Sequence, residues 1–148
     1  MRHVFETCAT FEEACRLLET APVARPVLFT VVGCKPGERV VIERHATISR
    51  VHRDETIVAN AWRDETSGWR SRCNTVDDPV ASNQQRRMGL ATWAGRDDDT
   101  FAWAAPPVLN KDTRLTVEMC AASGRLAVMG WEPNGKGSVE PVTRRTEF

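Results

Sequence analysis

Net charge is the first property that the sequence lacks. Its 20 lysine and arginine residues are balanced by 20 aspartate and glutamate residues, so the formal charge is zero. Proteins that bind nucleic acids or anionic membrane surfaces non-specifically do so through a strong basic field. The balanced charge therefore argues against nucleic acid and membranes as partners.

Long apolar runs are also missing. No stretch of about 18 apolar residues occurs, which is the shortest length typical of a transmembrane helix. The first residues, MRHVFETCATF, contain no apolar run of the length that a secretory signal needs. We therefore expect a cytoplasmic protein without a membrane segment.

The sequence also lacks cysteine and histidine residues at the spacings typical of metal sites. The five cysteines are odd in number and widely separated, and no C-x-x-C pair occurs, which argues against a disulfide framework and a cysteine-rich zinc site. The histidines, His3, His45 and His52, are scattered without ligand spacing. We expect neither a metal nor a cofactor. The cysteines are Cys8, Cys15, Cys34, Cys73 and Cys120.

The sequence does have the length and composition of one globular domain. Its 148 residues can bury a core, and 41% of them are hydrophobic. No internal repeat is visible. Residues 133–148 show no hydrophobic periodicity, so we expect a single domain over residues 1–132 followed by a flexible tail.

Local patterns predict an α+β fold. Thr10 and Glu13 have the spacing of a capping box, which predicts a helix over residues 11–20. The unbroken apolar run at residues 27–32 predicts a strand that is buried on both faces. Gly33 to Gly37 predict a hairpin loop that leads into a strand at residues 40–44, and further strands are predicted at residues 47–51 and 56–60. Residues 115–131 read as a hairpin with a turn that contains Gly124.

Polar residues between positions 39 and 90 indicate a site. Asn60 lies at the end of a predicted strand, and a long polar loop follows over residues 63–80. Ser82 and Asn83 can cap a helix over residues 84–94, which puts Arg86 in its first turn. Convergent polar groups of this kind form binding and catalytic sites.

Four segments resemble a known family when they are taken in order. They read VVGCKPGERVVIERH, IVANAW, NQQRRMGL and PPVLNKDTRLTVEMCAASGRL. The ordered set is similar to the C-terminal half of the acid ceramidase and N-acylethanolamine acid amidase family. This family belongs to the choloylglycine-hydrolase-like N-terminal-nucleophile hydrolases, which cleave linear C–N amide bonds. The resemblance covers about residues 5 to 131 and implies part of an αββα sandwich.

The resemblance also implies roles for two residues. Asn60 matches the family asparagine that helps to form the oxyanion hole, where an amide N–H stabilises a tetrahedral intermediate. Arg86 matches an arginine that approaches the nucleophile, where a guanidinium can hold a thiolate or a carbonyl oxygen. Asn60 and Arg86 are the catalytic residues that the resemblance assigns.

The chain departs from the family at the nucleophile. These enzymes use an N-terminal cysteine whose own α-amino group serves as the base, and the chain here starts with Met1 and Arg2. The arginine and aspartate that follow the family nucleophile are absent too. Cys34, at a strand end, is the one rival nucleophile. The expectation is therefore a C-terminal portion that is inactive alone and needs an N-terminal half, in a longer protein or a partner chain.

Two other interpretations stay open. A half-sandwich exposes a sheet face, so the chain could be a non-catalytic homodimeric binding or scaffold module. The resemblance could also be one of fold alone, in an unrelated α+β domain. For an assembled amidase we expect a small acyl-amide substrate, with bile-salt, ceramide-like, acyl-ethanolamine and penicillin-like amides all open.

Overall fold

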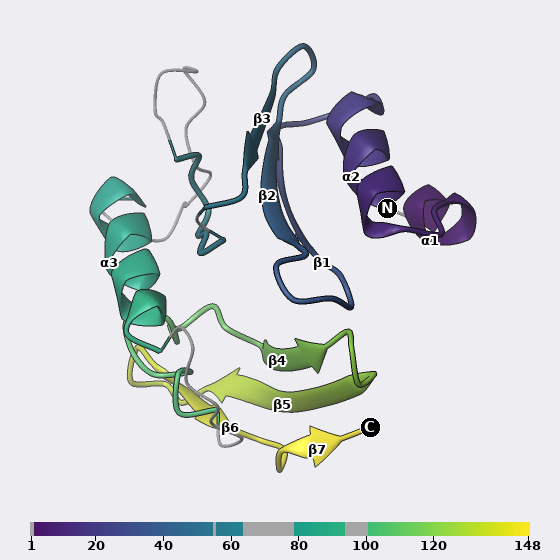
Figure 1. Ribbon diagram of the computed structural model, residues 1–148. Coiled ribbons are helices and arrows are strands. Elements are labelled where there is room, and N and C mark those ends of the chain that lie inside the picture. Colours follow the sequence, from purple (N-terminus) through teal and green to yellow (C-terminus); the bar gives the residue numbers. More distant parts are fainter. Residues whose placement is uncertain (1, 55, 64–78, 94–100) are drawn as a thin grey trace. The chain divides into compact units, whose positions relative to one another are not determined.

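The chain forms two compact units, Met1–Arg72 and Cys73–Phe148. The computed structural model describes residues 2–54, 56–63, 79–93 and 101–148 (Figure 1). Each unit has its own antiparallel sheet and its own core. The prediction from the sequence is a single domain over residues 1–132. Most of the long polar loop predicted at residues 63–80, together with Cys73, lies outside the described residues.

The first unit begins with two short helices, α1 (Arg2–Thr7) and α2 (Phe11–Thr20). The capping box predicted at the start of α2 is confirmed. The Glu13 amide donates to Thr10 Oγ1 at 3.2 Å, and Glu13 Oε2 accepts from the amides of Ala9 and Thr10 at 2.8 and 3.1 Å. These bonds satisfy backbone donors that a helix start leaves unpaired, so α2 begins where the sequence predicts.

The cap gives the first unit a pH dependence of known sign. Hydrogen bonds from the Ala9 amide and then the Thr10 amide lower the pKa of the exposed Glu13 carboxyl. A lowered pKa stabilises the fold above the pKa of the unfolded chain, and this contribution is lost as pH falls through the folded-state value. Glu13→Gln keeps an acceptor without the titration. We expect wild type to melt at a slightly higher temperature than Glu13→Gln near neutral pH, and the gap to close as pH falls from the pKa of glutamate in the unfolded chain through the lowered folded-state value. A gap that is constant in circular-dichroism melts across this range would contradict the assignment.

The sheet of the first unit has three antiparallel strands in the order β1 (Val27–Val32), β2 (Arg39–Arg44) and β3 (Ser49–His52). The predicted hairpin between β1 and β2 is confirmed. Its loop is closed by a bond of 2.7 Å from the Gly33 amide to the Glu38 carbonyl, and Gly37 has a φ of 83°, which glycine adopts without steric cost.

Burial is concentrated in β2 rather than in β1. The sequence predicts that residues 27–32 are buried on both faces, and this prediction is wrong: β1 is an edge strand that is half-buried to exposed. The central strand β2 is buried from Val40 to Arg44. Val40 and Ile42 pack with Cys15 and Leu18 of α2, which covers one face of the sheet (Figure 1). Because strand side chains alternate, Glu43 points to the other face.

The second unit combines helix α3 (Pro79–Ala91) with strands β4 (Leu115–Cys120), β5 (Arg125–Pro133), β6 (Val139–Pro141) and β7 (Thr146–Glu147). The predicted hairpin at residues 115–131 is confirmed as the β4–β5 pair. The main core of this unit consists of Phe101, Ala104, Ala127, Trp131 and Val139.

The C-terminal residues differ from the predicted flexible tail. Residues after Pro133 form β6 and β7, and both strands pair with β5. The amides of Leu126 and Phe148 each donate to the carbonyl of the other residue, at 3.2 and 2.8 Å. Because strands this short carry no periodicity that a sequence window can detect, the long partner β5 determines their position.

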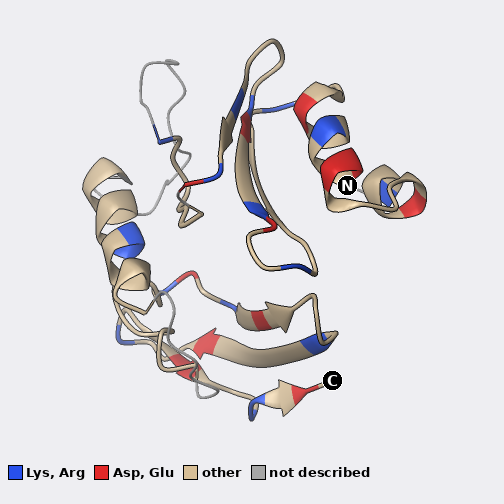
Figure 2. Ribbon diagram, in the orientation of Figure 1, with Lys and Arg blue, Asp and Glu red and all other residues tan. Residues whose placement is uncertain are grey.

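The secondary structure is therefore α+β with two antiparallel sheets. Within the described part of the chain, no helix has the length and apolar character that crossing a membrane requires. Figure 2 shows acidic and basic residues in both units, as the balanced composition indicates.

Candidate functional site

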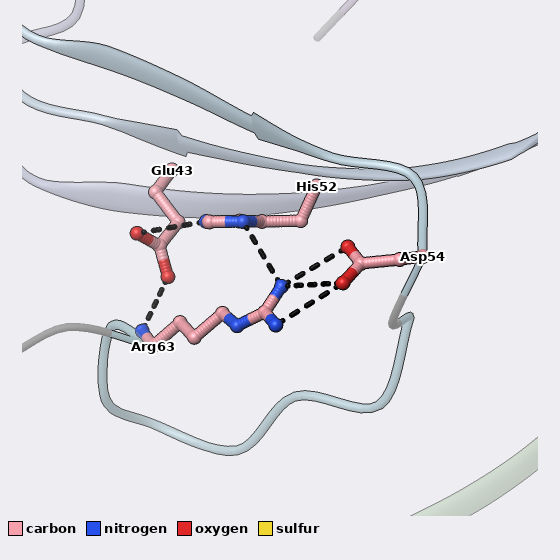
Figure 3. Close-up of polar contacts among 4 residues, drawn as sticks. All are labelled: Glu43, His52, Asp54 and Arg63. Carbon is pink, nitrogen blue, oxygen red and sulfur yellow. Dashed lines mark hydrogen bonds and ion pairs between the residues drawn. The ribbon is translucent and has the colours of Figure 1, made fainter.

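A buried carboxylate on β2 organises the polar groups of the first unit. Glu43 directly follows the apolar residues Val40–Ile42 of the strand and is only 1% exposed. A buried carboxylate without partners costs several kcal/mol, so its contacts identify what the fold has arranged around it. Figure 3 shows those contacts with His52 and Arg63, and the contacts of Arg63 with Asp54.

Each Glu43 oxygen has a different neighbour. Oε1 accepts a hydrogen bond of 2.5 Å from the backbone amide of Arg63, a residue that follows β3. Oε2 lies 3.3 Å from Nε2 of His52, at the end of β3, in an electrostatic contact rather than a well-aligned hydrogen bond. The carboxylate therefore joins the central strand to the segment that follows the sheet.

His52 is held on both sides of its ring. Its Nδ1 lies 3.4 Å from Arg63 Nη1. Because a guanidinium only donates, Nδ1 acts as the acceptor in this contact, and the Nε2 proton then faces Glu43. Both ring nitrogens are engaged with neighbouring side chains, so this geometry suits a structural histidine better than a general base.

The Arg63 side chain forms a second connection at the protein surface. Its guanidinium donates three hydrogen bonds to the Asp54 carboxylate, at 3.0, 3.1 and 3.1 Å. Asp54 lies two residues after the end of β3, so this ion pair joins the two ends of residues 54–63 (Figure 3). We call the described residues 56–63 the Asn60 segment.

The Asn60 segment places its asparagine at the surface. The sequence predicts a strand at residues 56–60, but residues 56–59 have no regular secondary structure and Asn60 lies in a bend. Asn60 is exposed, whereas Trp62 two residues later is 3% exposed. The Trp62 ring meets the His45 ring edge-on, with 6.5 Å between the ring centroids. The Arg50 guanidinium carbon lies 5.9 Å from the centroid of the Trp62 ring. An exposed asparagine therefore lies two residues before a buried, well-packed tryptophan, Trp62.

Arg86 lies in the middle of α3. The helix starts five residues before the predicted start at Gln84, so Arg86 is not in the first turn. Met88, two residues after Arg86 on the same helix, is 62% exposed. The half-buried Arg86 donates from Nη2 to Asn83 Oδ1 at 2.8 Å and from Nε to the Ser82 carbonyl at 3.4 Å. Asn83, which is 4% exposed, therefore helps to fix the plane of the guanidinium.

Asn60 belongs to the first compact unit and Arg86 to the second. Their convergence on one point stays a prediction. What the structure adds is the local environment of each residue: an exposed amide beside a buried anchor, and a guanidinium whose plane is set by a buried amide.

The described cysteines have different environments. Cys15 is buried in the first core, and desolvation raises the pKa of its thiol. Cys34 is exposed in the β1–β2 loop. This loop leads into Arg39, which lies four residues before Glu43 on β2, so about 13 Å of strand separates the end of the loop from Glu43. Cys120 is half-buried, and hydrogen bonds from Ser123 lower the pKa of its thiol. In the described ranges, no group of three or more His, Cys, Asp or Glu residues can hold a metal ion.

Sequence reasoning missed the cluster of Glu43, His52, Asp54 and Arg63. One signal was present: a glutamate directly follows the apolar run VVI within a predicted strand. The partners of that glutamate could not be found in the same way. Neither a protein-family model, nor a curated protein, nor a solved structure matches this chain.

Proposed function

We propose that this chain is the part of a cysteine-type amidase that supplies Asn60 and Arg86 to the active site. The nucleophilic cysteine and its α-amino group belong to another segment, in the same polypeptide or in a partner chain. Four segments in the family order support this proposal, and two antiparallel sheets are compatible with the αββα sandwich that it requires.

The observation that carries the proposal is that Asn60 is exposed while the residues just after it, Trp62 and Arg63, are held by the buried part of the first unit. An oxyanion-hole donor must reach the substrate and must also be held in place before the reaction begins. Asn60 is exposed, while Trp62 is 3% exposed and the Arg63 amide is bonded to the buried Glu43. The segment therefore combines access for a substrate with a fixed backbone.

Arg86 supplies positive charge in this proposal. A guanidinium has five N–H donors. Two of them contact Asn83 and Ser82 of its own helix, which orients the group and leaves capacity for a thiolate or a carbonyl oxygen. Asn83 acts here as a support for the orientation of Arg86.

The proposed reaction needs no redox partner. The cysteine thiolate attacks the amide carbonyl carbon, and the α-amino group takes the thiol proton. Asn60 Nδ2 donates to the oxyanion that forms on the carbonyl oxygen. The C–N bond then breaks, the leaving amine takes the proton, and water hydrolyses the acyl thioester to a carboxylic acid. The substrate class is a small acyl amide.

The test uses the protein as isolated from its own host, with the chains that accompany it. We expect a cysteine at the N-terminus of one segment, release of aminomethylcoumarin from an N-acyl-aminomethylcoumarin, and loss of this activity on treatment with iodoacetamide. A native protein without such a segment and without hydrolysis overturns the proposal.

Arg86→Ala is then expected to lower kcat/KM of the active assembly by about 10- to 100-fold, as the loss of a charge-assisted hydrogen bond does. Arg87→Ala is the matched control on the same helix, and its effect should be smaller than about threefold. Equal losses in both variants would indicate general disruption of α3 rather than a role for Arg86.

A second candidate function is a homodimeric binding module, and exposed side chains on β4 favour it. Leu115 and Met119 are 58% and 77% exposed, and their spacing places them on one face of this strand. Among the described strands, β4 lies at an edge of its sheet. Sedimentation distinguishes the two: a concentration-dependent dimer without amidase activity would support the binding module.

A further inference from the structure

We propose that Glu43 is a positioning residue for Asn60, because it holds the Asn60 segment through the backbone amide of Arg63. This inference rests on the proposed amidase function. It assigns no contact between Glu43 and substrate. The role of Glu43 is to keep the Asn60 amide in the orientation that the oxyanion needs.

The connection from Glu43 to Asn60 is short. Arg63 follows Asn60 by three residues, so at most about 10 Å of extended chain separates the bonded amide from the asparagine. The bond from the Arg63 amide to Glu43 Oε1 is 2.5 Å long, and Glu43 is 1% exposed. A charge-assisted bond in a buried environment is stronger than a neutral bond at the surface.

The remaining contacts hold Glu43 itself. Its neighbours on the strand, Ile42 and Arg44, are buried, and the Arg44 guanidinium donates to the Ala21 carbonyl at 2.6 Å. His52 lies against Oε2, the oxygen that does not bind Arg63. The carboxylate is therefore fixed by the central strand on one side and by His52 on the other.

The Asp54–Arg63 ion pair provides an internal comparison. It closes the same stretch of chain, but the Asp54 side chain is 68% exposed and that of Arg63 is 37% exposed. Exposed ion pairs contribute little, because solvent screens them and their side chains lose freedom. If Glu43 is the anchor, the segment should tolerate loss of Asp54 and should not tolerate loss of the Glu43 acceptor.

Three variants separate these contributions. Glu43→Met keeps most of the side-chain volume and removes the acceptor for the Arg63 amide. Glu43→Gln keeps an amide oxygen at that place and removes the charge. Asp54→Asn weakens the exposed pair and leaves the Glu43 acceptor in place. Because Glu43→Met also removes the cost of burying a charge, the variant is expected to fold.

The first readout is amide hydrogen exchange in the 148-residue chain, which needs no activity. We expect the Arg63 amide to exchange at least about tenfold faster in Glu43→Met, since a buried bond to a charged group is lost. Glu43→Gln and Asp54→Asn should stay within about threefold of wild type. An unchanged rate in Glu43→Met, with β2 amides still protected, overturns the inference.

The second readout is the split between kcat and KM in the native assembly. Glu43→Met should lower kcat at least about tenfold with KM nearly unchanged, and Glu43→Gln should restore most of the loss. If wild type hydrolyses the reporter and Glu43→Met keeps full kcat, Glu43 is not a positioning residue while the amidase function stands. If wild type is inactive, the amidase function fails, and hydrogen exchange still decides whether Glu43 holds the segment.

Discussion

Asn60→Ala is expected to lower kcat of the assembled amidase by about 10²- to 10³-fold, which is the typical cost of removing one oxyanion-hole donor. The loss should fall on kcat more than on KM, because the negative oxygen exists only after the thiolate has attacked. Steady-state kinetics with an acyl-amide reporter measure both constants. A kcat of Asn60→Ala within threefold of wild type would contradict the assignment of Asn60 to the oxyanion hole.

Stability provides the control for this substitution. Asn60 is exposed, so alanine at this position should change the melting temperature very little. Asn60→Asp replaces the amide donor with a carboxylate of similar shape, which repels the developing oxyanion. We expect this variant to be at least as impaired as Asn60→Ala. An active Asn60→Asp variant would show that the amide N–H is not used.

Trp131→Ala is expected to lower the free energy of unfolding of the second unit by about 3–5 kcal/mol, as large-to-small substitutions of buried aromatic residues do. The Trp131 ring belongs to the core that contains Phe101 and Ala127. Its Nε1 also donates to Thr116 Oγ1 at 3.0 Å, a bond between two buried groups of neighbouring strands. Alanine removes the packing and the donor together.

Trp131→Phe separates these two losses. It keeps an aromatic ring and removes the donor to Thr116, so the expected destabilisation is smaller, about 1–2 kcal/mol. Urea unfolding followed by far-ultraviolet circular dichroism measures both variants without using tryptophan fluorescence. Equal destabilisation by both substitutions would attribute the loss to the missing donor and contradict a contribution from ring packing.

The elements that the sequence predicts well are those that local chemistry specifies. The capping box of Thr10 and Glu13 lies within four residues, and α2 has the predicted bounds. The hairpins around Gly37 and Gly124 also follow from residues at the turn itself, where both glycines have positive φ. In each case the decisive contacts join neighbours in the chain, so a short window contains them.

The elements that differ depend on distant partners. Residues 56–59 look like a strand because a threonine precedes the apolar run of residues 57–59. They have no regular structure, and the next residues are held by Trp62 and Glu43 instead. Strands β6 and β7 exist because β5 is long enough to pair with both. The bond from Arg63 to Glu43 spans 20 residues in the sequence. No periodicity connects positions so far apart, and this is why the Glu43 cluster escaped prediction.

The donor in the Glu43 anchor is a main-chain N–H, and this determines which substitutions the anchor tolerates. Every amino acid except proline carries that donor, so position 63 can vary widely without breaking this bond. Position 43 needs a side-chain acceptor of the correct length, which only glutamate and glutamine provide. Related sequences with the same anchor should therefore vary freely at position 63, avoid proline there, and keep glutamate or glutamine at position 43.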